Sequence, residues 1–510
     1  MNVEQLVRPR WESSTIKLIG TIELILALVL LIPSVIALVL NEDVLQFLIP
    51  VPVLLAFGVF QTVFFDNSHN DRAANILLLV GLTWLLMFAV GTVPYLYNGY
   101  SPVDAVFESV AGFTTTGASI MADLSDCATS LLIWRSLTQW IGGIAVIMIF
   151  MYILPMLGAG RSFFMNELAG SGSSSFSVKM RTAAKSFILV YVALSAVNLV
   201  LLLALQVEWD EALCLAFTTI STGGSIPTEN SMAGYGYPVQ IVTLVFMFLG
   251  GTNFYLHYSA LVLHQRKVYR RNSEFKTYLV WFVAISIIVY LMVVLRMADV
   301  ASLTLEDHAR YYFDSLFTTV ALGTSAAFTT VDYTLFPQQC IVLLMIVALL
   351  GASSGSTGGG IKIARLHVVY QSVRNSMFRT LHPNSVVSVK VDKQPLDDSA
   401  VLSAFSVMMM FFVTLAVGVV IFLMLGHEFT ESVGMGIASI SNLGLGLGEY
   451  GPQSTFAGLD SMSKVLMVIL MWVGRLEVFT ALVFFTPGFW REIWMSHRAR
   501  VKSKKASRSK

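Results

Sequence analysis

The hydrophobic positions of this chain are gathered into long runs, which shorter polar stretches separate. A helix needs about 20 apolar residues to cross about 30 Å of hydrocarbon. Runs of this length predict ten membrane-spanning helices, near residues 16–40, 48–66, 74–97, 131–155, 186–207, 238–263, 278–297, 338–363, 401–425 and 462–486. The first run is too long for a cleaved signal, so we expect it to remain as a helix.

Composition supports a membrane protein. Of the 510 residues, 56% are hydrophobic and 12% are charged, whereas soluble proteins carry about 25% charged residues. The mean hydropathy is +0.73, so the surface must largely face lipid, which excludes a soluble structural role. No nucleic-acid partner is expected. Three scattered cysteines are too few for a disulfide framework or a zinc site, and we expect them to pack: Cys127, Cys214 and Cys340.

Charge is distributed unevenly between the two sets of connections. Basic residues fall between spans four and five, six and seven, eight and nine, and in the tail; examples are Arg161, Lys179, Arg271, Arg379 and Lys505. Basic connections stay cytoplasmic, which predicts cytoplasmic N- and C-termini. The other connections are acidic, with Arg310 as the exception. The acids would concentrate cations, or they collect there simply because the bases are kept inside.

Four of the acidic connections repeat one pattern. Each has a short helix-like stretch and then a turn rich in Gly, Ser and Thr: DAVFESVAGFTTTGAS, DEALCLAFTTISTGGS, DSLFTTVALGTSAAFT and ESVGMGIASISNLGLG. In each, an acid precedes the turn by thirteen residues: Asp104 and Gly117, Asp210 and Gly223, Asp314 and Ala327, Glu431 and Gly444. Such internal repetition predicts four units of helix, re-entrant loop and helix.

This pattern has a chemical consequence. Non-helical backbone at membrane depth is tolerated only inside protein or along a wet cavity. A short helix entering from outside points its carbonyl end towards the membrane centre, and glycine lets the chain turn with positive φ. Rings of backbone carbonyls are how potassium channels select their ion. Four such loops would form one pore per chain.

We therefore predict an all-α polytopic membrane protein, with four M1–P-loop–M2 repeats around a pseudo-fourfold pore and two additional N-terminal transmembrane helices. The expected segments are a two-helix unit (1–70), pore repeats 1 and 2 (71–157 and 158–266), pore repeat 3 with a broken helix (267–380), pore repeat 4 (381–488) and a basic cytoplasmic tail (489–510).

Further motifs carry a family resemblance. RSLTQWIGGIAV (135–146), GASSGSTGGGIKIAR (351–365), LHPNSVVSVKV (381–391) and GRLE (474–477) resemble segments of the TrkH/KtrB/HKT superfamily of potassium transporters. The two additional N-terminal spans favour the TrkH branch. The resemblance implies potassium uptake across a bacterial inner membrane, with K+ as the transported ion and no bound cofactor. It also implies a homodimer with a TrkA-like nucleotide-binding cytoplasmic ring, and no enzymatic activity.

By position, the resemblance implies filter carbonyls from Thr115, Thr116, Gly117, Ser221, Thr222, Gly223, Ser325, Ala326, Ala327, Asn442, Leu443 and Gly444. Ala327 departs from the family, which has glycine there. An alternative register uses Gly323, because AFTTISTGGS and LFTTVALGTS look alike. We prefer Ala327, because the thirteen-residue offset and the match of Phe317 with Phe107 support it. Serine at the first-loop position accompanies sodium transport in some relatives, so Gly117 favours potassium.

The eighth span contains a run of small residues that should break its helix; its glycines are Gly351, Gly355, Gly358, Gly359 and Gly360. We interpret the run as a movable gate beneath the filter, against the alternative of a small-residue helix crossing. The run lacks the GK[ST] ending of a phosphate loop. Lys362 and Arg365 would mark the cytoplasmic end of this span.

Several polar residues lie within the predicted spans. Arg475 should face the interior or water, and in the family an arginine here adds to the barrier; the alternative is a structural ion pair. Arg135 and Gln139 should brace the first filter loop. His257 is expected to be a hydrogen-bonded packing residue, and a metal site with His264 is not expected.

Two competing functions differ from potassium uptake. The first is that of a sodium-permeable or sodium-coupled member of the same superfamily, an alternative that Ala327 supports. An intramembrane enzyme would need paired Asp, Glu or His residues within the spans, and the sequence shows none.

Overall fold

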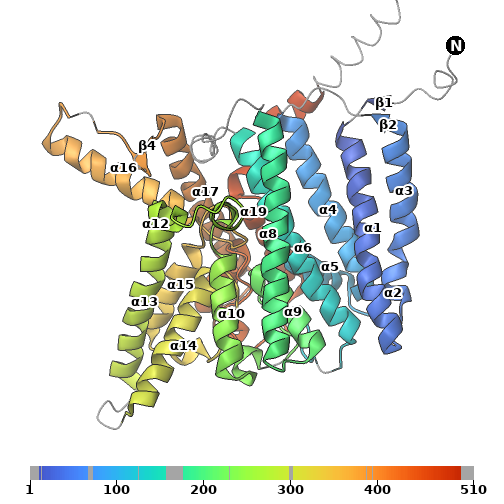
Figure 1. The fold of residues 1–510 in the computed structure, drawn as a ribbon, viewed down its shortest axis with the longest axis horizontal. Coiled ribbons are helices and arrows are strands. Elements are labelled where there is room, and N and C mark those ends of the chain that lie inside the picture. The colour runs from blue at the N-terminus through green and yellow to red at the C-terminus, as the bar shows by residue number, and fades with distance from the viewer. Residues whose placement is uncertain are drawn as a thin grey trace, which may run out of the picture. The chain divides into compact units, whose positions relative to one another are not determined.

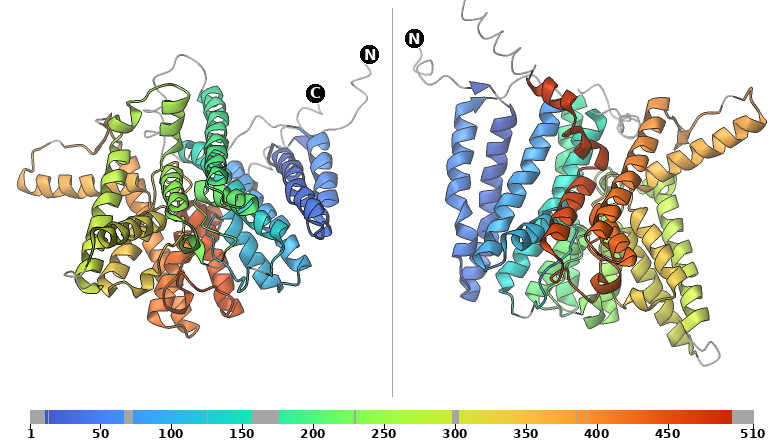
Figure 2. Two further views of the ribbon diagram at one scale, coloured as in Figure 1. Left: turned by 60° about the horizontal axis from the view of Figure 1, so that its bottom comes forward. Right: turned by 180° about the vertical axis from the view of Figure 1, so that it is seen from behind.

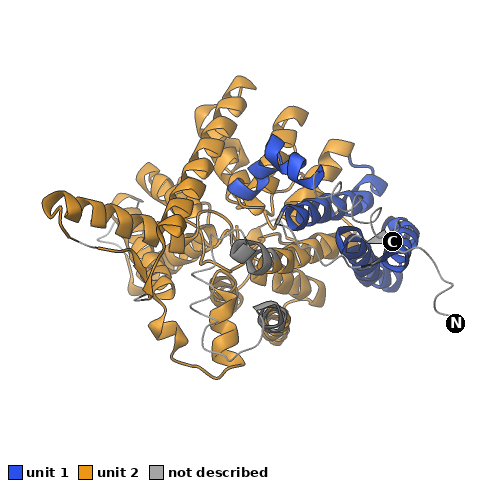
Figure 3. Cartoon of the chain, turned by 90° about the horizontal axis from the view of Figure 1, so that it is seen from above, with its two compact units in different colours: residues 1–101, 479–510 blue, residues 102–478 orange. Residues whose placement is uncertain are grey.

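The computed structural model describes residues 11–12, 14–66, 73–124, 126–156, 176–228, 230–297, 303–385, 387–392 and 394–494. The chain divides into two compact units, residues 1–101 with 479–510 and residues 102–478 (Figure 3). Arg161 and the predicted basic tail beyond residue 494 lie outside the described residues. The six predicted segments remain a prediction.

The first unit contains the two predicted N-terminal helices. Its elements are β1 (Trp11–Glu12), α1 (Ser14–Leu40), α2 (Leu45–Leu48), α3 (Pro50–Phe64), β2 (Phe65–Asp66), α4 (Ala73–Tyr97) and most of α20 (Val478–Val483). Helices α1 and α3 approach closely, because a Cβ on Gly58 would lie 2.9 Å from the carbonyl oxygen of Gly20. Small residues permit such contacts in membranes.

The second unit holds the repeated helices. They are α5 (Pro102–Phe113), α6 (Thr129–Met156), α8 (Phe176–Ala204), α9 (Trp209–Ile220), α10 (Tyr237–Gly250), α11 (Phe254–Leu261), α12 (Val268–Arg271), α13 (Ser273–Met297), α14 (Leu305–Gly323), α15 (Gln338–Leu349), α16 (Ile363–Leu381), α17 (Asp398–Met424), α18 (Phe429–Ile440) and α19 (Ser461–Arg475). Strands β3 (Lys390–Val391) and β4 (Gln394–Pro395) form a small antiparallel pair.

Short helices alternate with long ones in chain order. A long helix, a short helix and a second helix follow one another as α8–α9–α10, α13–α14–α15 and α17–α18–α19; α4, α5 and α6 have the same order. We call α5, α9, α14 and α18 the pore helices. In Figure 1, α9 and α14 lie at the lower end of the second unit, opposite α12 and α16. The predicted fold class is confirmed.

Three of the ten predicted spans are broken in the structure. Within the described residues, seven helices are long and apolar enough to cross a membrane, or eight if α10 and α11 count as one. Helices α10 and α11 meet at a bend of 100°, where Asn253 caps α11 by accepting a hydrogen bond from the Tyr255 amide. Residues 350–362 separate α15 from α16, and α19 ends at Arg475, before the positive φ of Glu477. Only the break after α15 was predicted.

The long helices expose apolar side chains, as expected for a multi-pass membrane protein facing lipid. In the apolar window of α17 only 17% of the residues are buried, and Leu402 is 67% exposed. Helix α16 differs, because its first half packs Val368 and Val369 against Val389 and Leu396. Its second half reaches outward from the second unit (Figure 2).

Candidate functional site

The chain turns in the same way after each pore helix. Two residues with positive φ follow, two positions apart: Thr115 (51°) and Gly117 (75°), Thr222 (51°) and Gly224 (74°), Ser325 (57°) and Ala327 (53°), Asn442 (51°) and Gly444 (80°). The residue between them donates its amide to the carbonyl five positions back in every copy: Thr116 to Ala111, Gly223 to Thr218, Ala326 to Ala321 and Leu443 to Ala438, at 2.8–2.9 Å. We call these four three-residue turns the filter loops.

This geometry corrects the predicted register of the second loop. Ser221 is the C-cap of α9, with φ −74°, and it therefore corresponds to Thr114, not to Thr115. The second filter loop is Thr222–Gly223–Gly224, one residue later than the sequence predicted. The spacing of thirteen residues between acid and turn is kept, because Glu211 precedes Gly224 by thirteen residues.

The backbone also distinguishes the two registers considered for the third loop. Gly323 is the last residue of α14, and a Cβ there would overlap the ring of Phe282. The turn comes after it, with Ala327 at the position of the other three glycines. Ala327 is 6% exposed and has φ +53°. Left-handed backbone costs a residue with a Cβ about 1 kcal/mol.

The loops are neighbours in cyclic order. A Cβ on Gly117 would overlap the carbonyl oxygen of Gly223, and one on Gly224 would overlap that of Ala326. A Cβ on Gly444 would likewise overlap that of Thr116. We call the contact between two neighbouring loops a seam. At three seams (one–two, two–three and four–one) the glycine that ends one loop packs against the carbonyl of the middle residue of the next loop. At the third–fourth seam the chain has Ala327 instead.

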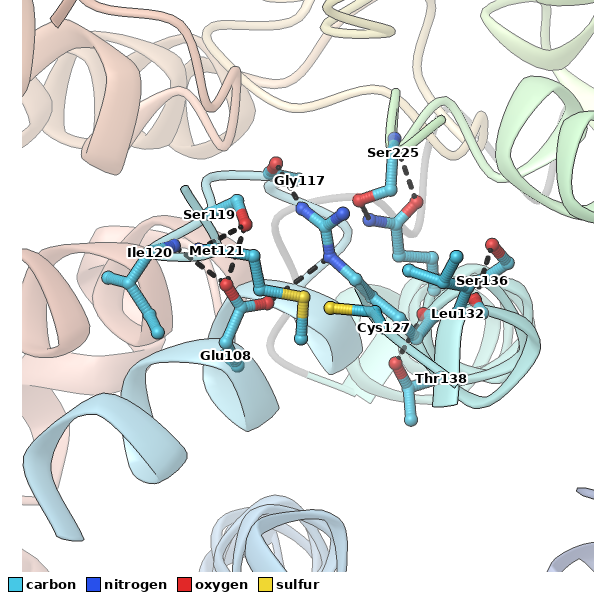
Figure 4. A network of polar contacts seen from close by, with 12 residues as sticks. Glu108, Gly117, Ser119, Ile120, Met121, Cys127, Leu132, Ser136, Thr138 and Ser225 are labelled. Atoms are coloured by element: carbon cyan, nitrogen blue, oxygen red, sulfur yellow. Dashed lines mark hydrogen bonds and ion pairs between the residues drawn. The ribbon is translucent and has the colours of Figure 1, made fainter. Parts of the chain in front are cut away.

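Polar side chains hold the first loop. Glu108 of α5 accepts hydrogen bonds from Ser119 Oγ and the Ile120 amide, both at 2.7 Å, and lies 3.2 Å from Arg135 Nε (Figure 4). Arg135 Nη2 donates to the Gly117 carbonyl at 3.4 Å. Arg135 and Glu108 are 5% and 0% exposed, so neither charge is solvated by bulk water. The pair fixes the loop relative to α5 and α6.

The side-chain amides of Gln139 and Asn442 connect neighbouring repeats. Gln139 Nε2 donates to Ser225 Oγ at 2.5 Å, just beyond the second loop (Figure 4 labels Ser225). Asn442 Nδ2 donates to Thr116 Oγ1 at 3.0 Å and to the Met471 carbonyl at 2.9 Å. Gln139 was predicted as a brace, whereas this role of Asn442 was not.

The acids that precede the filter loops by thirteen residues have different partners. Asp104 Oδ1 lies 2.7 Å from Lys464 Nζ, Glu211 accepts from the Tyr235 hydroxyl at 2.8 Å, and Asp314 accepts from Thr330 Oγ1 at 2.9 Å. Burial and then the bond to Glu211 raise the pKa of the Tyr235 phenol. Asp104 and Glu211 also lie in the first turns of their helices, where carboxylates are favoured. Sequence reasoning missed Lys464 because it opens an apolar run.

Residues 350–362, here named the gate loop, are non-helical and mostly buried. The backbone of this loop bonds to the bend between α10 and α11: Ser353 donates to the Gly251 carbonyl at 3.0 Å, and the Phe254 amide donates to the Gly355 carbonyl at 3.1 Å. Glu274 Oε1 accepts from the Ser354 amide at 2.5 Å. Gly355 and Gly360 each have φ +68°, so glycine is needed at both positions.

Arg475 lies against the gate loop. Its Nη1 donates to the Thr357 carbonyl at 2.9 Å, and the residue is 5% exposed. Among the described residues, Nε and Nη2 have no hydrogen-bond partner. Glu477 does not pair with it, because Glu477 Oε2 lies 2.6 Å from Arg365 Nη2. Within the part of the chain that the structure describes, Arg475 therefore forms no ion pair with the nearby Glu477.

The remaining predicted residues have ordinary partners. His257 is 2% exposed, with Nδ1 2.8 Å from the Tyr269 hydroxyl and Nε2 2.9 Å from the Leu249 carbonyl. Lys362 Nζ contacts the Gly358 carbonyl and lies at the N-cap of α16. Within the described residues, no group of three His, Cys, Asp or Glu side chains could hold a metal ion.

Known proteins resemble this chain over nearly its whole length. A family model described as "TrkH: Cation transport protein" matches residues 53–491. The Trk system potassium uptake protein TrkH of Halomonas elongata is 29% identical over 490 residues, covering 94% of this chain and 99% of that protein. TrkH of Escherichia coli K12 is 28% identical over 486 residues, covering 93% and 99%. The crystal structure of the potassium transporter TrkH from Vibrio parahaemolyticus superposes with a TM-score of 0.84 at 27% identity, covering 94% of this chain and 99% of that one.

Proposed function

Because the chain belongs to the TrkH family of cation transport proteins, we propose that it takes up potassium through the ring of filter loops. The observation that carries the proposal is the fourfold turn, in which paired positive-φ residues recur at Thr115, Thr222, Ser325 and Asn442 and two positions after each. Carbonyls presented by such turns can replace the hydration shell of a potassium ion. The relatives named as potassium uptake proteins support the choice of ion.

The second candidate is a sodium-permeable or sodium-coupled transporter. Ala327 favours it, because alanine stands at the position where the other three loops have the glycine that closes their seams. A wider seam would hold the surrounding carbonyls less rigidly, and a less rigid filter discriminates less well between ions of different size. Gly117, with φ +75°, favours potassium.

The gate loop and Arg475 would control conduction. The loop is attached by backbone hydrogen bonds and single side-chain contacts, which one conformational change could break together. Arg475 adds a positive charge that opposes cations. Displacement of the loop would remove both obstacles. A TrkA-like nucleotide-binding ring on the cytoplasmic side would drive that displacement.

We further propose a homodimer in the bacterial inner membrane, with both termini cytoplasmic. The second half of α16 supports self-association, because one of its faces carries exposed apolar side chains at helical spacing: Tyr370, Val373, Met377 and Leu381, which are 64%, 48%, 67% and 77% exposed. Exposed apolar stripes of this kind mark interaction surfaces. Coupling to protons, as in a symporter, would use the same pore.

The test is rubidium-86 uptake into proteoliposomes that contain the purified chain, with unlabelled potassium or sodium as competitor. Competition by potassium alone supports the potassium filter, whereas equal competition by both ions favours the sodium-permeable alternative. If uptake is absent, the measurement is repeated with a TrkA-like partner and with residues 355–360 deleted. No uptake under all three conditions would contradict the pore.

A further inference from the structure

The gate loop is hydrogen-bonded to the third filter loop itself. The Gly359 amide donates to Ser325 Oγ at 2.7 Å, and Ser325 Oγ donates in turn to the Thr324 carbonyl at 2.7 Å. This hydroxyl therefore both donates and accepts a hydrogen bond. Ser325 is 2% exposed, so no bulk water can replace the bond. Ser325 is also the first residue of its filter loop, with φ +57°.

A second contact joins the gate loop to the second filter loop. Thr357 Oγ1 lies 3.2 Å from Thr222 Oγ1. It lies 3.0 Å from the carbonyl oxygen of Ile220, the last residue of α9. Thr222 and Ser325 occupy the same position in successive loops, so the gate loop uses equivalent hydroxyls of two repeats.

The gate loop also packs against the residues that precede the third and fourth filter loops. A Cβ on Gly358 would lie 2.8 Å from the Thr324 carbonyl oxygen, and one on Gly359 would overlap the Ser441 carbonyl oxygen. A side chain at either position would force its neighbours to shift. The loop therefore packs against the C-caps of α14 and α18, in addition to its hydrogen bond with Ser325.

We infer that Ser325 and Thr222 form an ion-sensitive latch, through which occupancy of the filter controls whether the gate loop stays closed. The inference rests on the proposed function, because it requires the filter loops to bind the transported cation. A bound cation fixes the backbone of Ser325, and a fixed backbone keeps Oγ in place for the Gly359 amide. Since coupling between two sites is reciprocal, release of the loop must also change the affinity of the filter for cations.

The first test measures uptake without any partner subunit. Ser325→Ala leaves the Gly359 amide unpaired in the closed state, and we expect basal rubidium uptake to rise about tenfold. Ser325→Thr keeps the hydroxyl, and threonine already occupies the equivalent positive-φ positions 115 and 222, so its increase in uptake should be much smaller than that of Ser325→Ala. The matched control is Ser439→Ala, because this buried hydroxyl donates to the Met435 carbonyl within its own helix.

The second test measures loop position without transport. Cysteine replaces Ser354 in a chain whose three native cysteines are changed to alanine, and its rate of maleimide modification is compared in potassium and in N-methylglucamine. We expect several-fold slower modification in potassium, and no difference when Ser325→Ala is added.

Equal rates in both media, in a chain that still transports rubidium, would overturn the latch and leave the pore intact. A difference that persists in Ser325→Ala would also overturn it. Absence of rubidium uptake in every variant would instead reject the proposed function.

Discussion

Lys464 Nζ lies 2.7 Å from Asp104 Oδ1, although the two residues are 360 positions apart in the chain. The contact joins the start of pore helix α5 to the start of α19, and so connects the first repeat to the fourth. Lys464 is only 7% exposed and also donates to the Ala457 carbonyl at 3.1 Å. The ring of repeats is therefore tied at its ends by side chains as well as by the filter loops.

Lys464→Met should lower the free energy of unfolding by about 2 kcal/mol, because a hydrogen bond to a charged group contributes about 1.5–3 kcal/mol. Thermal unfolding of the detergent-solubilised protein measures the change. In a double-mutant cycle with Asp104→Asn, the second substitution should cost much less once the first is present. Fully additive losses would mean that the pair does not interact.

Gly224→Ala should reduce rubidium uptake by more than tenfold, whereas Ser221→Ala should have little effect. The reason is that a Cβ on Gly224 would overlap the Ala326 carbonyl, while Ser221 only caps α9. Uptake into proteoliposomes, normalised to folded protein, compares the two variants. The opposite ranking would restore the register in which Ser221 belongs to the filter.

Ala327→Gly should increase the preference for potassium over sodium by about fivefold. This value assumes that the strain of about 1 kcal/mol is relieved within the filter, since 1.4 kcal/mol corresponds to a factor of ten. Removal of the methyl would let the third–fourth seam close like the others. Competition of unlabelled sodium with rubidium measures the preference, and an unchanged ratio would show that the methyl is irrelevant to selection.

Arg475→Gln should raise basal uptake by tenfold or more. Two unit charges 4 Å apart interact by about 4 kcal/mol at an effective dielectric constant of 20, so loss of the positive charge lowers the barrier even at longer range. Rubidium uptake without a partner subunit measures the effect. Arg296→Gln is the control, because Arg296 is an exposed arginine in the last turn of α13. Equal increases in both variants would assign the effect to surface charge.

Much of the fold could be predicted, because it depends on patterns that are local in the chain. Apolar runs predicted the long helices, and the repeated acid-to-turn spacing predicted the pore helices. The breaks near Asn253 and Glu477 were missed. Hydropathy averages over such short polar interruptions, and a single capping residue or positive φ does not change the average.

Within the candidate site, the one-residue error in the second loop has a definite cause. Two adjacent acids, Asp210 and Glu211, precede two adjacent glycines, Gly223 and Gly224, so either pairing satisfies the offset of thirteen. Only the φ values distinguish the two. Contacts such as Ser325 with Gly359 join distant parts of the chain, and a single sequence holds no signal for them.

The constant spacing between acid and turn restricts how the four repeats can diverge. Helix α14 has 19 residues and the other three pore helices have 12, yet Asp314 and Ala327 keep the separation of Asp104 and Gly117. Additional residues lie before the acid, never between acid and turn. One inserted residue there would rotate the acid by about 100° around the helix axis and shift it by about 1.5 Å. These helices can therefore lengthen at their outer ends, while insertions and deletions within the thirteen-residue interval would be selected against.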